Sequence, residues 1–290
     1  MQRSEFIRKS MFGLFALPTL RSLGQFSEQL DTQETKMPAL FLGHGSPMNA
    51  LENNEFTQGW QALAQSLPRP KAILCISAHW ETRGTLVTAM EKPKTIHDFG
   101  GFPKELYEVQ YPAPGDPALA KETSQLVKKT PVGLDLDWGF DHGSWSVVKR
   151  MFPNADIPMI QMSLDYGNGP QWHYELAKEL AVLRTKGILI IGSGNMVHNL
   201  RMLNWRNPDE SYDWAEEAHS TFTTLIQNGD HQKLINYNAL GKSAALAIPT
   251  PEHFLPLLYT LGLKEKNDPV RFFNDKTVLG SIAMTSVQIG

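Results

Sequence analysis

The chain has 290 residues, of which 41% are hydrophobic, 10% aromatic and 20% charged, a balance that supplies a substantial core and excludes a disordered chain. Its formal net charge is −3 and its basic residues form no run, which argues against nucleic acid as a partner. The single cysteine, Cys75, excludes an internal disulfide framework and a cysteine-rich zinc module.

Residues 1–36 differ from the rest of the chain and resemble a leader. Three basic residues precede an apolar stretch, 11–20, that is too short to span a bilayer, which needs about 20 residues. The string RSEFIRKS resembles a twin-arginine export signal, except that Ser4 replaces the second arginine. We favour a cytoplasmic protein with an N-terminal helix, and export to the periplasm is the alternative. The catalytic domain is expected to cover 37–290.

Short apolar runs then alternate with helical patterns along the chain. Strands are predicted at 38–42, 72–78, 85–90, 157–163, 187–193 and within 278–290. Helices are predicted at 55–66, 117–129, 170–185, 211–228 and 252–262, two of them capped by Asp116 and Thr250, which precede prolines. Two long loops, 91–116 and 137–145, exceed what a connection needs. The pattern predicts an α/β fold, a single three-layer α/β/α sandwich around a mostly parallel sheet.

Three histidines stand just after predicted strands, where open α/β sheets bind their ligands. His44 follows the first strand, His79 follows the second, and His198 lies a few residues past the strand at 187–193. Parallel strands end at one edge of a sheet, so the topology can bring these three side chains together. Neutral imidazole is a common ligand of zinc and iron. We therefore predict a metal site at the carboxyl ends of the strands.

Four further side chains are candidates for the same site. His253, near the start of a predicted helix, is a fourth possible ligand, and its neighbour Glu252 competes with it. His142 lies in a loop flanked by glycine and is a candidate polar catalytic group, and His97 is a weaker candidate of that kind. The remaining histidines are expected to carry no chemistry: His173, His219 and His231.

Other familiar catalytic motifs are absent or incomplete. The string GSGNMVHN lacks the third glycine of a dinucleotide site, and neither GxSxG nor HExxH occurs. Cys75 lies within an apolar run and is expected to be inert core. Aromatic residues near the histidines either pack in the core or line a pocket for a flat aromatic substrate: Trp80, Phe99, Phe102 and Trp145.

Eight motifs in order carry a family resemblance. They are MPALFLGHGSPMNALE, ISAHWETRG, TIHDFGGFP, YPAPGDPALA, WGFDHGSW, GSGNMVHNLR, PTPEHFLPLLY and SVQIG. Together they resemble the bacterial 4,5-DOPA extradiol dioxygenase family, part of the class III extradiol group that includes the protocatechuate 4,5-dioxygenase catalytic subunit. The resemblance runs from about Met37 to Gly290. It implies an enzyme that opens the ring of a catechol such as L-DOPA with O₂, by 4,5-cleavage to a semialdehyde.

The resemblance also implies roles for individual residues. His44 and His79 match metal-binding histidines of the family, and His198 and His253 match the two remaining metal positions. In the wider group the third ligand is a glutamate and the equivalent of His198 acts as a base, so these roles stay open. His142 matches an active-site histidine that donates a proton.

One divalent metal ion is implied, and its identity bears on the reaction. Members of the subfamily are often assigned zinc, but zinc has no redox chemistry, so cleavage with O₂ requires Fe(II). The alternatives are a zinc-dependent hydrolase that uses the same positions to activate water, and a metal-binding relative without catalysis. The expected partners are a small catechol and O₂, and the sequence carries no signal for an oligomeric state.

Overall fold

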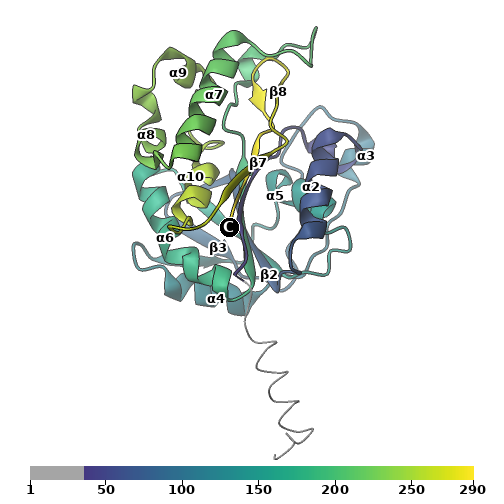
Figure 1. Cartoon of the computed structure of the whole chain (residues 1–290). Helices are drawn as coiled ribbons and strands as arrows, with labels where there is room; N and C mark the ends of the chain where they lie inside the picture. The colour runs from purple at the N-terminus through teal and green to yellow at the C-terminus, as the bar shows by residue number, and fades with distance from the viewer. Residues whose placement is uncertain (1–35) are drawn as a thin grey trace, which may run out of the picture. The chain divides into compact units, whose positions relative to one another are not determined.

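An eight-stranded sheet forms the middle layer of the part that the computed structural model describes, residues 36–290 (Figure 1). In spatial order its strands are β4 (Val132–Asp135), β3 (Thr85–Thr88), β5 (Met159–Asp165), β2 (Ala72–Thr82), β6 (Ile188–Gly194), β1 (Ala39–Gly43), β10 (Ser286–Ile289) and β7 (Val270–Phe273). The four central strands, β5, β2, β6 and β1, run parallel, while β3 and β10 pair with them in the antiparallel sense. The predicted α/β fold with a mostly parallel sheet is confirmed.

Helices cover both faces of this sheet (Figure 1). One face carries α2 (Glu55–Ser66), α3 (Lys104–Tyr107) and α5 (His142–Met151). The other face carries α4 (Pro117–Leu126), α6 (Pro170–Thr185), α7 (Asp213–Asn228), α8 (His231–Ile235), α9 (Lys242–Ala247) and α10 (Leu255–Gly262). The remaining elements are the 3-10 turns η1 (Pro47–Ala50), η2 (Leu200–Met202) and η3 (Tyr237–Ala239) and the hairpin of β8 (Thr277–Val278) and β9 (Ile282–Ala283). No helix among the described residues has the length and apolar character needed to cross a bilayer.

Side chains of the central strands pack alternately into two separate cores. In β1, Phe41 faces the core under α6 and α10, whereas Leu40 faces the core under α2 and α5. In β6, Ile190 and Leu189 divide in the same way. Burial on both faces explains why these strands are continuous apolar runs in the sequence. The leader expected in residues 1–36 falls outside the described residues apart from Lys36, and the domain boundary at 37 stays a prediction.

The two predicted helix caps have different outcomes. The Asp116 carboxylate accepts a hydrogen bond of 2.9 Å from the backbone N–H of Leu119, so this cap is confirmed. The cap at Thr250 was wrong, because α10 begins at Leu255 without a side-chain cap. The carbonyl of His253 instead accepts the backbone N–H of Asn195, which holds the preceding turn against the end of β6.

The expectation of a loop at 137–145 was also wrong in part. Helix α5 begins at His142, and the Asp141 carboxylate caps it by accepting the backbone N–H of Ser144. The glycine that follows His142 indicated a loop, but it lies inside the helix. Strand β2 is longer than predicted and contains His79, with a register shift between Ile76 and Glu81. His79 therefore lies within a distorted strand rather than after it.

The buried Arg184 of α6 ties three chain segments together. Its Nε donates to the carbonyl of Met37 at 2.8 Å, and its Nη2 donates to the carbonyl of Ile289 at 3.0 Å. Nη1 donates to the Leu263 carbonyl and to the Asp268 carboxylate, both at 2.7 Å. One guanidinium thus fixes the start of β1, the end of β10 and the end of α10, as its rigid fork of donors permits.

Replacing Arg184 by methionine removes the donor to three carbonyls and leaves the Asp268 carboxylate with Lys36 and the backbone N–H of Glu265. We expect the free energy of unfolding to fall by about 3–5 kcal/mol, because a buried charge partner is lost. Urea denaturation measures this loss. The control is Arg69→Met, whose ion pair with Asp156 is exposed, and which is expected to change stability by less than about 1 kcal/mol. Equal losses in the two variants would contradict the role of Arg184.

Candidate metal and active site

Five histidines gather where the parallel strands end. They are His44 after β1, His79 in β2, His142 at the start of α5, His198 after β6 and His253 before α10. The Nε2 atoms of His44 and His79 lie 3.2 Å apart. The ring of His253 lies 5.3 Å from that of His44 and 5.0 Å from that of His79, centroid to centroid. The residues that the sequence singled out thus form one cluster.

Strand β6 brings the first two histidines together. It pairs with β1 as far as Gly43 and with β2 as far as Ser77, in parallel on both sides. The backbone N–H of His44 continues the ladder by donating to the carbonyl of Gly194 at 3.1 Å. The register shift in β2 lies around His79, and such irregularities commonly redirect a side chain next to an active site.

Two glycines allow the other segments to approach these strands. A Cβ on Gly143 would lie 2.5 Å from Ser77 Oγ and 2.7 Å from His79 Cδ2. A Cβ on Gly194 would lie 2.2 Å from the carbonyl oxygen of His253. Any larger residue at either position would push α5 or the turn before α10 away from the sheet. Neither Gly143 nor Gly194 has a positive φ, so it is these close contacts, rather than the backbone conformation, that require glycine at the two positions.

The carboxylate of Asp98 lies behind two of the imidazoles. Its Oδ1 accepts the backbone N–H of His142 at 2.8 Å, and its Oδ2 lies 3.0 Å from His142 Nδ1. The same Oδ2 lies 3.4 Å from His79 Nδ1. Burial raises the pKa of the Asp98 carboxyl, but the hydrogen bonds from His142 lower it by more, so the pKa lies below its usual value.

Two more imidazoles have an oxygen partner at Nδ1. His44 Nδ1 lies 3.0 Å from Ser193 Oγ, and His253 Nδ1 lies 3.1 Å from Glu252 Oε1. His198 has no side-chain hydrogen bond to the described residues, and its ring stacks on that of His253 at 3.5 Å and 9°. An imidazole whose Nδ1 is held by an oxygen presents Nε2 to the centre of the cluster, the usual arrangement of metal-binding histidines.

Burial lowers the pKa of the imidazoles. For His79, burial and a neighbouring imidazole lower the pKa to about 3, and for His198 burial lowers it to about 4. Burial also holds the pKa of His44 and His253 well below the usual value. These four side chains are therefore neutral near pH 7, the form in which histidine binds a metal or accepts a proton.

The donor set fits a divalent metal ion. Two sets of three side chains bring one ligand atom each to within 4.8 Å of one another: His44, His79 and His142, and His198, Glu252 and His253. Neutral imidazoles with or without a carboxylate suit zinc and iron. The cluster is therefore able to hold one such ion.

Other candidates from the sequence lie outside the cluster. His97 Nε2 donates to the carbonyl of Val109 at 2.9 Å, so this imidazole fixes a loop. Trp145 is fully buried in the core, and Trp80 is buried and stacks on Trp138. Phe99 differs from them, because its ring lies 5.5 Å from that of His142 in an edge-on arrangement. Among the four aromatic candidates from the sequence, Phe99 is thus the one with a ring contact to a histidine of the cluster, and Phe102 packs edge-on against Phe99 at 5.4 Å.

Sequence reasoning missed the polar residues behind the histidines. Asp98 and Ser193 hold imidazoles, and Asp141 caps α5 while accepting a 2.7 Å hydrogen bond from Ser77 Oγ. Burial raises the pKa of the Asp141 carboxyl to about 6. The signal for Asp98 and Asp141 was their place beside histidines, in TIHDF and FDHG.

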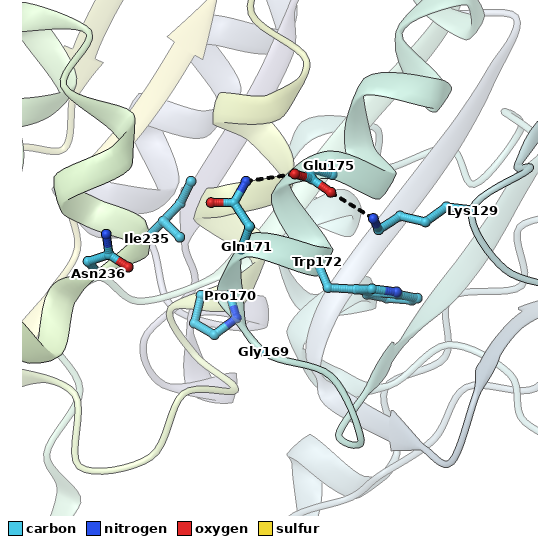
Figure 2. A pocket seen from close by; sticks show the side chains of 8 residues that line it. All are labelled: Lys129, Gly169, Pro170, Gln171, Trp172, Glu175, Ile235 and Asn236. Atoms are coloured by element: carbon cyan, nitrogen blue, oxygen red, sulfur yellow. Dashed lines mark hydrogen bonds and ion pairs between the residues drawn. The ribbon is translucent and has the colours of Figure 1, made fainter.

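A separate pocket of about 400 Å³ lies at the start of α6, and no histidine of the cluster lines it. Figure 2 shows three of its polar side chains, Lys129, Gln171 and Glu175, bonded to one another. Glu175 accepts from Gln171 at 3.0 Å and from Lys129 at 2.7 Å. Because these groups satisfy one another, the histidine cluster remains the candidate site.

Comparison with known proteins finds a matching family and similar curated relatives. Residues 38–287 match the family described as the catalytic LigB subunit of aromatic ring-opening dioxygenase. The chain is 51% identical over 260 residues to 4,5-DOPA dioxygenase extradiol of Escherichia coli K12, covering 88% of this chain and 96% of that protein. It is 35% identical over 255 residues to the protein of the same name in Beta vulgaris, covering 85% and 94%.

A solved structure shows the same fold. The crystal structure of an uncharacterized protein from Escherichia coli K12 matches with a TM-score of 0.75 and 45% identity, over 88% of this chain and all of that one. The family resemblance predicted from the eight motifs is therefore confirmed. The chain belongs to the family of catalytic LigB subunits of aromatic ring-opening dioxygenases, and it is an extradiol ring-cleaving enzyme.

Proposed function

We propose that the protein cleaves the 4,5-bond of a catechol such as L-DOPA, using O₂ and one Fe(II) ion held by the histidine cluster. The observation that carries the proposal is a group of buried imidazoles whose Nδ1 atoms have oxygen partners. The relatives from Escherichia coli and Beta vulgaris bear the name 4,5-DOPA dioxygenase extradiol, which supports this substrate class. The family match favours a dioxygenase over the zinc hydrolase and the non-catalytic protein that the sequence left open.

The proposed ligands of the metal are His44, His79 and His253. Their ring centroids form a nearly equilateral triangle with sides of 5.1, 5.3 and 5.0 Å, as expected for three imidazoles around one ion. The ligand atom of His142 is also close, but its ring lies 3.9 Å from that of His79, and Asp98 holds it from behind. When bound, Fe(II) supplies redox chemistry and positive charge that favours the ionised catechol.

His198 is proposed as the base, one of the two roles that the family resemblance left open. Its ring is nearly parallel to that of His253, so the two cannot both direct an in-plane lone pair at one ion. A catechol hydroxyl, like other phenols, loses its proton well above neutral pH. The neutral, partly exposed imidazole of His198 is suited to accept this proton.

His142 is proposed as the acid that returns a proton to oxygen during ring opening. Its Nδ1 is held by the Asp98 carboxylate at 3.0 Å, which stabilises a positively charged imidazolium by a charge-assisted hydrogen bond. Its Nε2 is then the atom that donates. The overall reaction breaks one ring C–C bond and places both atoms of O₂ in the product, an aldehyde and a carboxylate.

The first test measures oxygen uptake by protein loaded anaerobically with Fe(II) and given L-DOPA. We expect one O₂ to be consumed for each ring-opened product, followed by its yellow absorbance. Protein loaded with zinc serves as the control and should consume none, because zinc has no redox chemistry. Failure to consume oxygen across a panel of catechols, with bound iron confirmed, would overturn the proposed function.

Replacing His79 by alanine removes one of the two imidazoles whose Nε2 atoms lie 3.2 Å apart. The variant should retain no metal after dialysis and show no turnover, since three ligands are reduced to two. Metal content by mass spectrometry and oxygen uptake measure the two effects. His219→Gln is the matched control, because His219 contacts Asp275 and Thr285 away from the cluster. Unchanged metal content in His79→Ala would sink the assignment.

Replacing His198 by glutamine distinguishes the two possible roles of this residue, proton acceptor and metal ligand. If His198 is the base, metal affinity should stay within a few-fold of wild type while kcat falls by about 10²–10⁴, the usual contribution of proton transfer. Chelator competition and steady-state kinetics provide the two measurements. A large loss of metal affinity would instead make His198 a ligand.

A further inference from the structure

We propose that Asp98 is a positioning residue that fixes the proton of two imidazoles at once, those of His79 and His142. The inference deepens the proposed function, since it rests on His79 as a ligand and His142 as an acid. A single carboxylate would thereby prepare both the metal site and the proton donor.

The geometry leaves the carboxylate only one way to bond. An ionised carboxylate accepts hydrogen bonds and donates none. Oδ2 accepts a 3.0 Å hydrogen bond from Nδ1 of His142, so this Nδ1 carries the proton. Nδ1 of His79 lies 3.4 Å from the same oxygen, and the negative charge there favours a proton on this Nδ1 as well. Each Nε2 then keeps its lone pair. The Nε2 lone pair of His79 is then free to bind a metal. The Nε2 lone pair of His142 is free to take up the proton that this residue later donates.

The loop that carries this aspartate is fixed on both sides. The backbone N–H of Ile96 donates to the carbonyl of Phe140 at 2.7 Å, and the indole N–H of Trp145 donates to the carbonyl of Ile96 at 2.8 Å. His97 adds the 2.9 Å bond to Val109. Oδ1 of the aspartate meanwhile accepts the first N–H of α5. Because the loop and the helix are held together, the carboxylate cannot turn away from the imidazoles.

The imidazoles of His79 and His142 both lie next to Oδ2 of Asp98, so a change of charge on one affects the other. Their ring centroids are 3.9 Å apart, so a proton gained by His142 places a positive charge next to His79. The Asp98 carboxylate lies close to both rings, at 3.0 Å from His142 Nδ1 and 3.4 Å from His79 Nδ1. The shorter contact is the one to His142. We therefore expect a change at Asp98 to affect the acid more strongly than the metal ligand.

Asp98→Asn tests the proposal without removing the side chain. The amide oxygen still accepts the backbone N–H of His142, and this bond fixes the orientation of the amide. The amide NH₂ then faces both Nδ1 atoms and donates to them, which moves each proton to Nε2. Helix capping is kept, so the melting temperature should change by no more than about 3 °C.

The decisive readout is the tautomer of each imidazole in metal-free protein at neutral pH, from ¹⁵N NMR of labelled histidines. His79→Gln and His142→Gln assign the two signals. We expect protons on Nδ1 in wild type and on Nε2 in Asp98→Asn, with Zn(II) affinity lowered about 10–100-fold in a chelator competition. Asp116→Asn, which alters a helix cap outside the site, should match wild type in both measurements.

Three results would overturn the inference. Wild-type protein with both protons on Nε2 would do so, whether or not any variant folds. An Asp98→Asn protein with wild-type tautomers and zinc affinity would do so as well. Asp98→Glu keeps an accepting carboxylate and should keep both protons on Nδ1. If the protons moved to Nε2 in this variant as in Asp98→Asn, the shape of the side chain rather than its hydrogen bonding would determine the tautomers, and the inference would fail. If the tautomers behave as expected but Fe(II)-loaded protein consumes no oxygen, the proposed function fails and the role of Asp98 stands.

Discussion

The parallel pairing of β6 with strands on both of its sides is the constraint on which the site depends. In the ladder between β1 and β6, Gly43 pairs with Gly194. In the ladder between β2 and β6, Ser77 pairs with Ser193, the residue before Gly194. The histidines that follow these positions therefore emerge side by side. A slip of one residue in either ladder would turn its side chains to the other face of the sheet, so the spacing of the imidazoles is determined by backbone hydrogen bonds.

The burial of several imidazoles together requires that each ring nitrogen be satisfied. Oxygen atoms of Ser193, Asp98 and Glu252 bond to Nδ1 of three rings, and Asp98 also lies 3.4 Å from Nδ1 of His79. In the proposed function the Nε2 atoms of His44, His79 and His253 would hold the metal ion. Desolvation and the neighbouring imidazoles lower the pKa of His44 and His253 and keep these two rings neutral. A divalent ion bound at the cluster would offset the negative charges of Asp98 and Glu252.

The sequence predicted the features that depend on local patterns. Helix α6 coincides with the predicted 170–185, because its proline start and regular spacing are local signals. The central strands were recognisable because burial on both faces makes them apolar throughout. The start of α5 was missed, since Gly143 is there to contact Ser77 and His79, a tertiary requirement. The partnership of Asp98 with His142 joins positions 44 residues apart, which no local pattern reveals.

The partners of the imidazoles differ in charge, and this difference bears on the division of roles. His44 faces the neutral hydroxyl of Ser193, which orients the ring without favouring its protonation. His142 has a carboxylate on its Nδ1 and the same carboxylate on its backbone N–H. Asp98 thus accepts two hydrogen bonds from His142, an arrangement that suits the proton donor proposed there. The proposed division between metal binding and proton transfer thus follows the difference between the oxygen atoms behind the imidazoles.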